Sequence, residues 1–375
     1  MAQKSIDTLI GERLRMTRKS MGYTQDEIAK AFQIGRPRYS DIENGKRHLS
    51  IEELYRFTDF YQRPLQYFLA QHEVSSDPFK VLFRAIRGKP ETQKVVTHFE
   101  KLCNNLKSLE KLMDGKDISL MKDTSYRSIR RSYPWAAIYA EKERANLEVG
   151  KAPLRNLRDI LEEKREIQVF YLGLPDSISG MFTFGEDVGG CILINGSHPV
   201  GRQLFSLAHE YAHYLFDRDK MGCVTEESKT NTTEERFADR FSADFLVPRE
   251  AIREIFELKV KDREPTAGDV VYLADYFGVS FQAMVYRLGG LRLIKRELGD
   301  RLLKETWINA VREEMGQPES EQKQSKLPRR YTYLCILAYV QGKITTAKFA
   351  DLLEIPLYKA MNIAKKIKKV KHGPI

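Results

Sequence analysis

The chain has 375 residues, which predicts two to four domains at about 100–200 residues each. Lys and Arg number 62 against 52 Asp and Glu, and the net charge of +10 permits contact with nucleic acid without establishing it. The four cysteines are scattered singly, no apolar run reaches the about 18 residues of a membrane span, and residues 1–5 lack the apolar core of a signal peptide. These features speak against a secreted disulfide scaffold and a membrane protein, and favour a cytoplasmic one.

Two short helices joined by a tight turn are expected between residues 24 and 44. Thr24 and Glu27 form a capping box, and Pro37 fits the first turn of the second helix. Tyr39 and Ile42 then face inward. This is the helix-turn-helix plan for the major groove, although a small helical bundle with a solvated arginine face fits about equally well. The side chains expected to face outward are Arg36, Arg38 and Ser40.

A longer string favours the DNA-binding alternative. The segment YTQDEIAKAF, followed by RYSDIENGKRHLSIEELYRFTDFY, resembles the Xre (lambda-repressor-like) helix-turn-helix family over about residues 6–69. The resemblance implies a five-helix domain that binds a double-stranded DNA operator, and a homodimer, because such proteins commonly use two half-sites about one helical turn apart. Gln33, in place of a turn glycine, and the acidic Asp41 depart from the pattern. The DNA contacts implied are Gln25, Arg36, Pro37, Arg38, Ser40 and Lys46.

The middle of the chain mixes strand and helix signals. Residues 71–150 are polar and helix-prone, with breakers at 75–78 and 88–90. Strands are expected at 167–172 and 191–194, and a helix at 201–216. The strand at 191–194 either flanks a cleft and pairs with an extended substrate or is an ordinary core strand.

A metal site is indicated on the helix at 201–216. His209 and His213 stand at i and i+4, so both imidazoles lie on one helix face and can share an ion. Glu210, beside the first histidine, can take a proton from a metal-bound water and deliver it to a leaving amine. An HExxH string alone arises by chance about once in a hundred chains of this kind.

A second helix start supplies carboxylates for the same site. Glu235 and Asp239 share one helix face, which would complete a His-His-Glu set with an aspartate to orient a histidine. Glu234 competes as the ligand but points about 100° away from that face. An ordinary acidic helix start is the structural alternative.

The strings FSLAHEYAHYLFD, EERFADRFSADFLVP and LADYFGVSFQAMVYRL together resemble the ImmA/IrrE family of zincin-like metallopeptidases, over about residues 130–297. The resemblance implies His209, His213 and Glu235 as metal ligands, Glu210 as the catalytic base and Asp239 as the residue behind the ligands. Zn²⁺ is the expected metal, with Mn²⁺ as the alternative. Tyr211 and Tyr214 are expected to be packing residues, and Cys223 not to be a ligand.

The last part of the chain carries less information. Residues 316–325 form a polar linker with no apolar residue to bury. A helix is expected at 331–341, and helix, turn, helix at 345–358. Residues 341–375 contain eight lysines against one aspartate and one glutamate, a local charge of +6. A second DNA-contacting or partner-docking module and a solvated tail are equally compatible with this pattern.

The expected fold is multidomain and mainly α: a five-helix Xre-type head, an α+β zincin-like peptidase domain with a small sheet, and a small helical C-terminal domain. The expected function is a DNA-binding transcriptional regulator with a zinc endopeptidase that cleaves a repressor, an antitoxin-like partner or itself in a stress or phage response. The alternative is a regulator whose peptidase-like domain is a non-hydrolytic sensor or dimerisation module. The expected boundaries are 1–70 (head), 71–129 (helical connector), 130–297 (peptidase), 298–326 (helix and polar linker) and 327–375 (basic helical domain).

Overall fold

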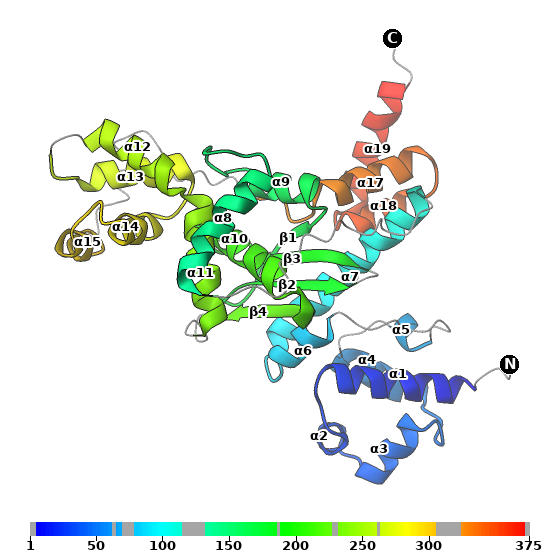
Figure 1. Cartoon of the computed structure of the whole chain (residues 1–375). Helices are drawn as coiled ribbons and strands as arrows, with labels where there is room; N and C mark the ends of the chain where they lie inside the picture. Colours follow the sequence, from blue (N-terminus) through cyan, green and yellow to red (C-terminus); the bar gives the residue numbers. More distant parts are fainter. Residues whose placement is uncertain are drawn as a thin grey trace.

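The computed structural model describes residues 5–61, 65–69, 79–114, 132–185, 188–226, 232–260, 263–304 and 324–371. These residues form a mainly helical molecule with one small sheet at its centre (Figure 1). The expected fold class is therefore confirmed. None of the helices in these ranges combines the length and the apolar character that crossing a bilayer requires.

Five helices form the N-terminal head, as expected. Its core is aromatic: Phe32 and Phe57 stack with ring centroids 4.1 Å apart, and the hydroxyls of the buried Tyr39 and Tyr61 lie 2.9 Å apart. The capping prediction for this region is confirmed, because Thr24 forms a capping box at the second helix. The helices are α1 (Ile6–Ser20), α2 (Gln25–Ala31), α3 (Arg36–Glu43), α4 (Ile51–Tyr61) and α5 (Leu65–Leu69).

Two helices connect the head to the sheet: α6 (Lys80–Ala85) and α7 (Pro90–Asp114). The breaker expected at 88–90 separates them, while the one at 75–78 and the connector beyond residue 114 lie outside the described residues. Arg87 pairs with Glu27 of α2, and Lys89 Nζ lies 2.8 Å from the Glu226 carboxylate on the sheet. The segment between α6 and α7 therefore contacts both the head and the sheet.

The sheet has four strands in the order β1-β3-β2-β4, with β1 parallel to β3 and the other pairs antiparallel. β3 is thus paired on both sides and is a core strand. It has no free edge for a substrate, so the alternative in which residues 191–194 pair with an extended peptide is wrong. The strands are β1 (Gln168–Leu172), β2 (Ile178–Gly185), β3 (Gly189–Asn195) and β4 (Gly222–Glu226).

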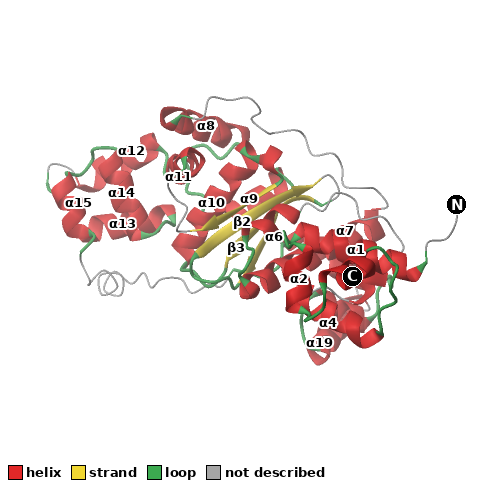
Figure 2. Cartoon of the chain, turned by 90° about the horizontal axis from the view of Figure 1, so that it is seen from below, coloured by secondary structure: helices red, strands yellow, loops and turns green. Residues whose placement is uncertain are grey.

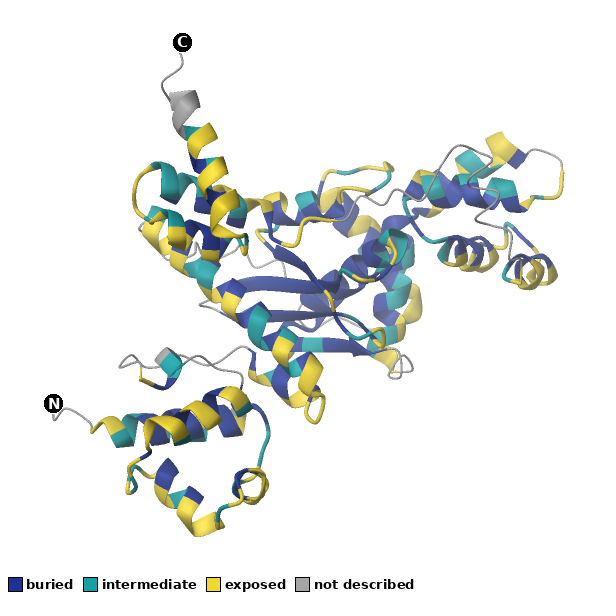
Figure 3. Cartoon of the chain, turned by 180° about the vertical axis from the view of Figure 1, so that it is seen from behind, coloured by how far each residue is buried: buried dark blue, intermediate teal, exposed yellow. Residues whose placement is uncertain are grey.

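Helices cover both faces of the sheet (Figure 2), so every residue of β3 is buried (Figure 3). Alternate residues of β3 face different cores: Ile192 belongs to the cluster under α9 and α10, and Leu193 to the cluster under α7. Phe99 of α7 meets Phe170 of β1 edge-to-face at 5.4 Å. The helices on the α10 side are α8 (Tyr133–Asn146), α9 (Leu157–Lys164), α10 (Val200–Phe216) and α11 (Thr233–Leu246), with a 3-10 turn at Arg218–Lys220.

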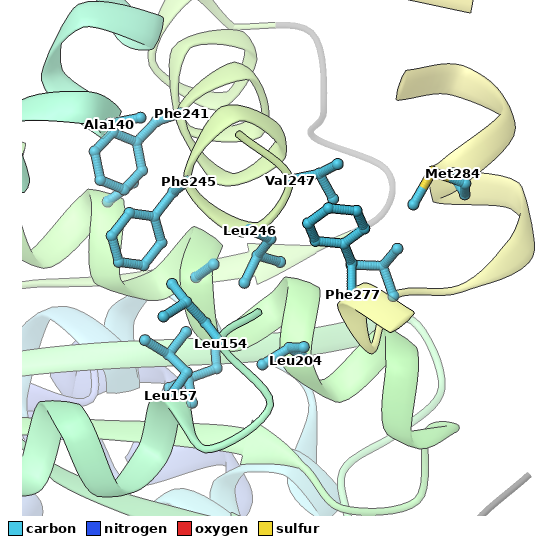
Figure 4. Packing of buried hydrophobic residues seen from close by; sticks show 14 of the residues in the cluster. Ala140, Leu154, Leu157, Leu204, Phe241, Phe245, Leu246, Val247, Phe277 and Met284 are labelled. Carbon is cyan, nitrogen blue, oxygen red and sulfur yellow. The ribbon is translucent and has the colours of Figure 1, made fainter. Parts of the chain in front are cut away.

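Four further helices extend the α10-side core. Phe245 and Val247, at the end of α11, belong to the same buried cluster as Phe277 and Met284 (Figure 4). The core is therefore continuous from the sheet into this helical part. The helices are α12 (Arg249–Val260), α13 (Ala267–Phe277), α14 (Phe281–Gly290) and α15 (Arg296–Leu302).

Three helices end the described chain: α17 (Arg329–Val340), α18 (Thr346–Leu352) and α19 (Leu357–Lys371). The helix expected at 331–341 is α17, and its Tyr331 is buried in the cluster that α7 shares with the sheet. Arg330 Nε lies 2.7 Å from the Glu110 carboxylate of α7. Most of the polar linker expected at 316–325 lies outside the described residues.

Candidate metal centre and nucleic-acid interface

Two histidines of α10 face the same point. His209 and His213 are one turn apart, and their Nε2 atoms lie 3.0 Å from each other. Both side chains are buried. The helix geometry alone brings the two imidazole rings together, because residues at i and i+4 lie on one face.

A glutamate from α11 completes the cluster. The Thr232 hydroxyl accepts a hydrogen bond from the Glu235 amide and so fixes the start of α11. Glu235 Oε2 lies 3.0 Å from His209 Nε2, and Oε1 lies 3.4 Å from His213 Nε2. Within the described ranges, this is the only set of three His, Cys or carboxylate side chains whose donor atoms are close enough to hold one ion.

The spacing of these donor atoms fits a tetrahedral ion. Ligand atoms about 2.0–2.1 Å from a tetrahedral zinc ion lie about 3.3 Å from one another, and the observed separations are 3.0 to 3.4 Å. Two imidazole nitrogens and one carboxylate oxygen are also the donor set of catalytic zinc sites. The residues present therefore fit a bound zinc ion.

Carboxylates behind the histidines fix the ring orientation. His209 Nδ1 lies 2.9 Å from Asp239 Oδ1, and His213 Nδ1 lies 2.8 Å from Asp217 Oδ2. Because an ionised carboxylate only accepts hydrogen bonds, each Nδ1 carries a proton, and Nε2 is the nitrogen that would present a lone pair to a bound metal ion. Two such lone pairs and a carboxylate around one point favour a cation between them.

The charges of the metal-free cluster reflect the same arrangement. Burial lowers the pKa of His209, but hydrogen bonds to Asp239 and Glu235 outweigh it and raise that pKa to about 10. Burial raises the pKa of Glu235, but hydrogen bonds to the two histidines outweigh it and hold that pKa at about 2. The cluster thus keeps Glu235 ionised and attracts positive charge.

Glu210 lies beside the cluster in a buried setting. Its side chain is fully buried, and the Thr225 side chain is a hydrogen-bonding neighbour of its carboxylate. Burial raises the pKa of this carboxyl, which the neighbouring His213 and His209 partly oppose. Gly180 of β2 leaves room for it, because a Cβ there would lie 2.9 Å from Glu210 Cγ.

The turn between α2 and α3 has a left-handed residue at its centre. Gln33 has φ of 55°, which explains why a glycine is expected at this position. The Ile34 amide donates to the Ala29 carbonyl at 2.9 Å and closes the turn. Tyr39 and Ile42 of α3 are buried, as their spacing predicts.

The expected DNA contacts lie on α2, on α3 and directly after α3. Gln25 is held partly in place, because its amide donates to Glu43 at 2.8 Å. Glu43 itself is buried and pairs with Arg18 at 2.6 Å. Arg36, Pro37, Arg38 and Lys46 are exposed, and Gln25 and Ser40 are half-buried.

Two known families match separate parts of the chain. Residues 14–68 match the family model described as Helix-turn-helix, and residues 162–289 match the peptidase family M78, described as IrrE N-terminal-like domain. The chain joins a helix-turn-helix domain to an IrrE-like domain.

One curated relative matches part of the chain. It is the uncharacterized HTH-type transcriptional regulator YqaF of Bacillus subtilis (strain 168), which is 53% identical over 38 residues. The match covers 10% of this chain and 50% of YqaF. The chain therefore spans about half the length of this relative.

Within the IrrE-like domain, the competing glutamate lies apart from the cluster. The Glu234 carboxylate is 3.8 Å from Lys220 Nζ, and its side chain is 40% exposed. Tyr211 is buried with its hydroxyl bonded to Glu143, and Tyr214 packs against Gly190. Both tyrosines are packing residues here, as expected.

Sequence reasoning missed two residues that shape the candidate metal centre. Asp217 carried a signal, because it follows His213 by four residues and so lies one turn on along the same helix. Gly180 carried none, since only the packing of β2 against α10 reveals why a side chain is excluded there. β4 was also missed, because its sequence, GCVTE, has little apolar alternation.

Proposed function

We propose that the chain is a DNA-binding transcriptional regulator whose IrrE-like domain is a zinc-dependent endopeptidase that cleaves a regulatory protein. The observation that carries the proposal is the convergence of His209, His213 and Glu235 on one point, with Glu210 beside them. The helix-turn-helix domain on the same chain supplies the link to transcription.

In this proposal His209, His213 and Glu235 hold the zinc ion, and Asp239 and Asp217 orient the two imidazoles. A zinc ion supplies Lewis-acid polarisation of a peptide carbonyl and of a water molecule. Three protein ligands are the number that catalytic zinc sites use, so these residues would leave the ion able to bind a water molecule or a substrate. Mn²⁺ is the alternative occupant.

Glu210 is the general base of the proposed reaction. Its carboxylate takes a proton from the attacking water and passes it to the nitrogen of the leaving amine. The burial that raises its pKa makes it a stronger base than an exposed glutamate.

The helix-turn-helix domain holds the protein at a double-stranded operator. Arg36 and Arg38 of α3 read base edges or phosphates, and Gln25, Pro37, Ser40 and Lys46 contribute the remaining contacts. Binding to two half-sites requires a homodimer. This assignment rests on the exposure of Arg36, Pro37, Arg38 and Lys46 in and after α3 and on the family match.

The proposed substrate is an Xre-type repressor, an antitoxin-like partner or a second copy of this chain, cleaved in a stress or phage response in the cytoplasm. Because the DNA-binding and peptidase-like domains share one chain, cleavage in trans within a dimer is the simplest version. It requires no partner other than the chain itself.

The test compares the wild-type chain with Glu210→Gln, and uses Glu234→Gln as the control for a glutamate change outside the cluster. Metal content is measured on the purified proteins, and new protein N-termini are mapped in cells that express each of them. We expect zinc in all three and new N-termini with the wild type and Glu234→Gln alone. If Glu210→Gln yields the same new N-termini as the wild type, the proposed peptidase activity is contradicted.

A second function has one observation in its favour. His209, Glu210 and His213 are 4%, 0% and 2% exposed, so this conformation offers a substrate little access. A non-hydrolytic sensor or dimerisation module would need no such access. Equal transcriptional responses from the wild type and Glu210→Gln favour this function, and mapping of genomic binding sites identifies the genes to monitor.

A further inference from the structure

The turn between α18 and α19 has the same backbone geometry as the turn of the helix-turn-helix domain. Glu354 has φ of 53°, close to the 55° of Gln33. The Glu354 amide donates to Asp351 at 3.2 Å and the Ile355 amide to Ala350 at 3.1 Å. Gln33 donates to Lys30 at 3.1 Å and Ile34 to Ala29 at 2.9 Å, so the two turns close with the same hydrogen bonds at the same spacing.

The helices on either side also correspond. A threonine caps the first helix in each, since Thr345 accepts from the Lys348 amide as Thr24 accepts from the Glu27 amide. Phe349 and Ala350 are buried where Ile28 and Ala29 are buried in α2. α19 therefore has the place in this module that α3 has in the head.

The outer face of α19 is basic. Lys359, Lys365 and Lys366 are exposed, and none of them forms an ion pair with a described residue. The two acidic residues of the module pair with residues outside α19: Asp351 lies 3.0 Å from Lys348 of α18 and 3.7 Å from Lys101 of α7, and Glu354 pairs with His98 of α7. The positive charge of α19 is thus not neutralised within the described chain.

The same turn ends several other helices of the described chain, for example at Glu148 and Arg292, so the turn alone does not make a DNA reader. Between α13 and α14, Gly278 has φ of 73° and the Val279 amide donates to Ala274 at 3.0 Å. The one basic residue of α14 is Arg287, which is buried and bonded to Asp244 at 2.6 Å. α14 has no cation to offer a phosphate, whereas α19 has at least three.

We propose that α18 and α19 form a second DNA-binding helix-turn-helix, with α19 as the helix that enters the major groove of a duplex. Lys359, Lys365 and Lys366 would neutralise phosphates, and this electrostatic contact is independent of base sequence. α19 and α3 lie at opposite ends of the molecule (Figure 1), so the two readers contact different stretches of DNA. The proposal does not depend on peptidase activity.

The test uses the full chain and a fluorescent mixed-sequence duplex of about three helical turns. Four proteins are compared by anisotropy: the wild type, Arg36→Ala/Arg38→Ala, Lys359→Ala/Lys365→Ala/Lys366→Ala, and the combination. We expect the lysine variant to lose about tenfold in affinity and about two to three in the slope of log K against log salt, because each lost phosphate contact removes about 0.9. The combination should lose nearly all binding.

A charge-matched control removes three exposed cations elsewhere, Lys295, Arg296 and Arg301 at α15, by the same change to alanine. It should bind DNA like the wild type, and all variants should melt like the wild type because the altered side chains are exposed. Unchanged affinity and salt slope in the lysine variant overturn the proposal. The proposal is also overturned if the lysine variant binds DNA like the wild type but no longer binds phosphatidylglycerol vesicles. That result would assign α19, with its exposed Leu357 and Tyr358, to a membrane surface.

Discussion

Asp217 accepts a hydrogen bond from His213 at 2.8 Å, one helical turn beyond the histidine. The bond fixes which nitrogen of His213 carries the proton and aims the other nitrogen at Glu235. Because Asp217 is buried at the end of α10, it holds the ring in a single orientation.

Replacing Asp217 by asparagine should weaken zinc binding about 10- to 100-fold, the usual effect of removing a carboxylate behind a histidine ligand. Competition with a chromophoric chelator measures this affinity. Glu234→Gln serves as the control, because Glu234 is exposed and contacts neither histidine. Equal affinities for Asp217→Asn and the wild type would show that His213 needs no such support.

Removing the metal should lower the melting temperature by at least about 3 °C, because an ion bound to the folded state alone stabilises it by about 2.7 kcal/mol at 100 times its dissociation constant. Scanning calorimetry before and after treatment with a chelator measures the difference. Glu235→Gln should show little difference, and Glu234→Gln should behave like the wild type. A chelator effect as large in Glu235→Gln as in the wild type would exclude Glu235 as a ligand.

Arg36→Ala combined with Arg38→Ala should weaken operator binding by well over tenfold, since each well-placed arginine contact contributes about 1–3 kcal/mol. A gel-shift titration on an operator found by genomic mapping is the measurement. Arg301→Ala, on the distant α15, should leave affinity unchanged. If the double variant binds as tightly as the wild type, α3 is not the recognition helix.

Glu43→Ala should lower the free energy of local unfolding of the head by about 3–5 kcal/mol, because it leaves the buried Arg18 without its carboxylate partner. Hydrogen exchange of α1 and α3 in the full chain reports this opening. Asp41→Ala, an exposed acidic residue of the same helix, should change exchange by less than about 0.5 kcal/mol. Similar exchange in the two variants would mean that the ion pair contributes nothing to the head.

The start of α13 should be sensitive to acid. Burial raises the pKa of Asp269, but hydrogen bonds from Arg263 and Thr266 outweigh it and hold that pKa at about 2. Because this value lies below the ordinary 3.8, the ionised group stabilises the fold above about pH 4, and the stabilisation is lost as pH falls towards 2.

Asp269→Asn should therefore melt below the wild type at pH 7, and the difference should vanish near pH 2. Asp300→Asn provides the control, because Asp300 is exposed and its carboxylate lies as far as 3.9 Å from Arg296 Nε. Its melting temperature should follow that of the wild type at every pH. A melting difference for Asp269→Asn that is independent of pH would assign the effect to packing instead of charge.

Local patterns in the sequence predicted what local physics determines. Thr24 and Glu27 do cap α2, Tyr39 and Ile42 do face the core, and the histidines of the HExxH string do share a helix face. The sequence left Glu234 and Glu235 as competing ligands, and the start of α11 at Thr233 resolves the geometry in favour of Glu235. The role of Glu235 as a metal ligand stays a prediction.

Contacts between distant segments could not be predicted. The pairing of β2 with β4 places a weakly patterned strand, GCVTE, at the sheet edge, and no local signal marks it. The packing of Phe99 on Phe170 joins α7 to β1, and Tyr331 enters the same cluster from the last part of the chain. Periodicity predicts which residues are buried, but it does not predict which distant segment packs against them.

This shared cluster has a consequence for synthesis on the ribosome. The strands and α7 are made long before α17, whose Tyr331, Leu334 and Cys335 help to bury their apolar surface. Until α17 leaves the exit tunnel, part of that surface stays uncovered and is open to aggregation. A nascent or prematurely terminated chain that ends before residue 329 therefore lacks the last layer of its own core and is a natural client for chaperones or proteases.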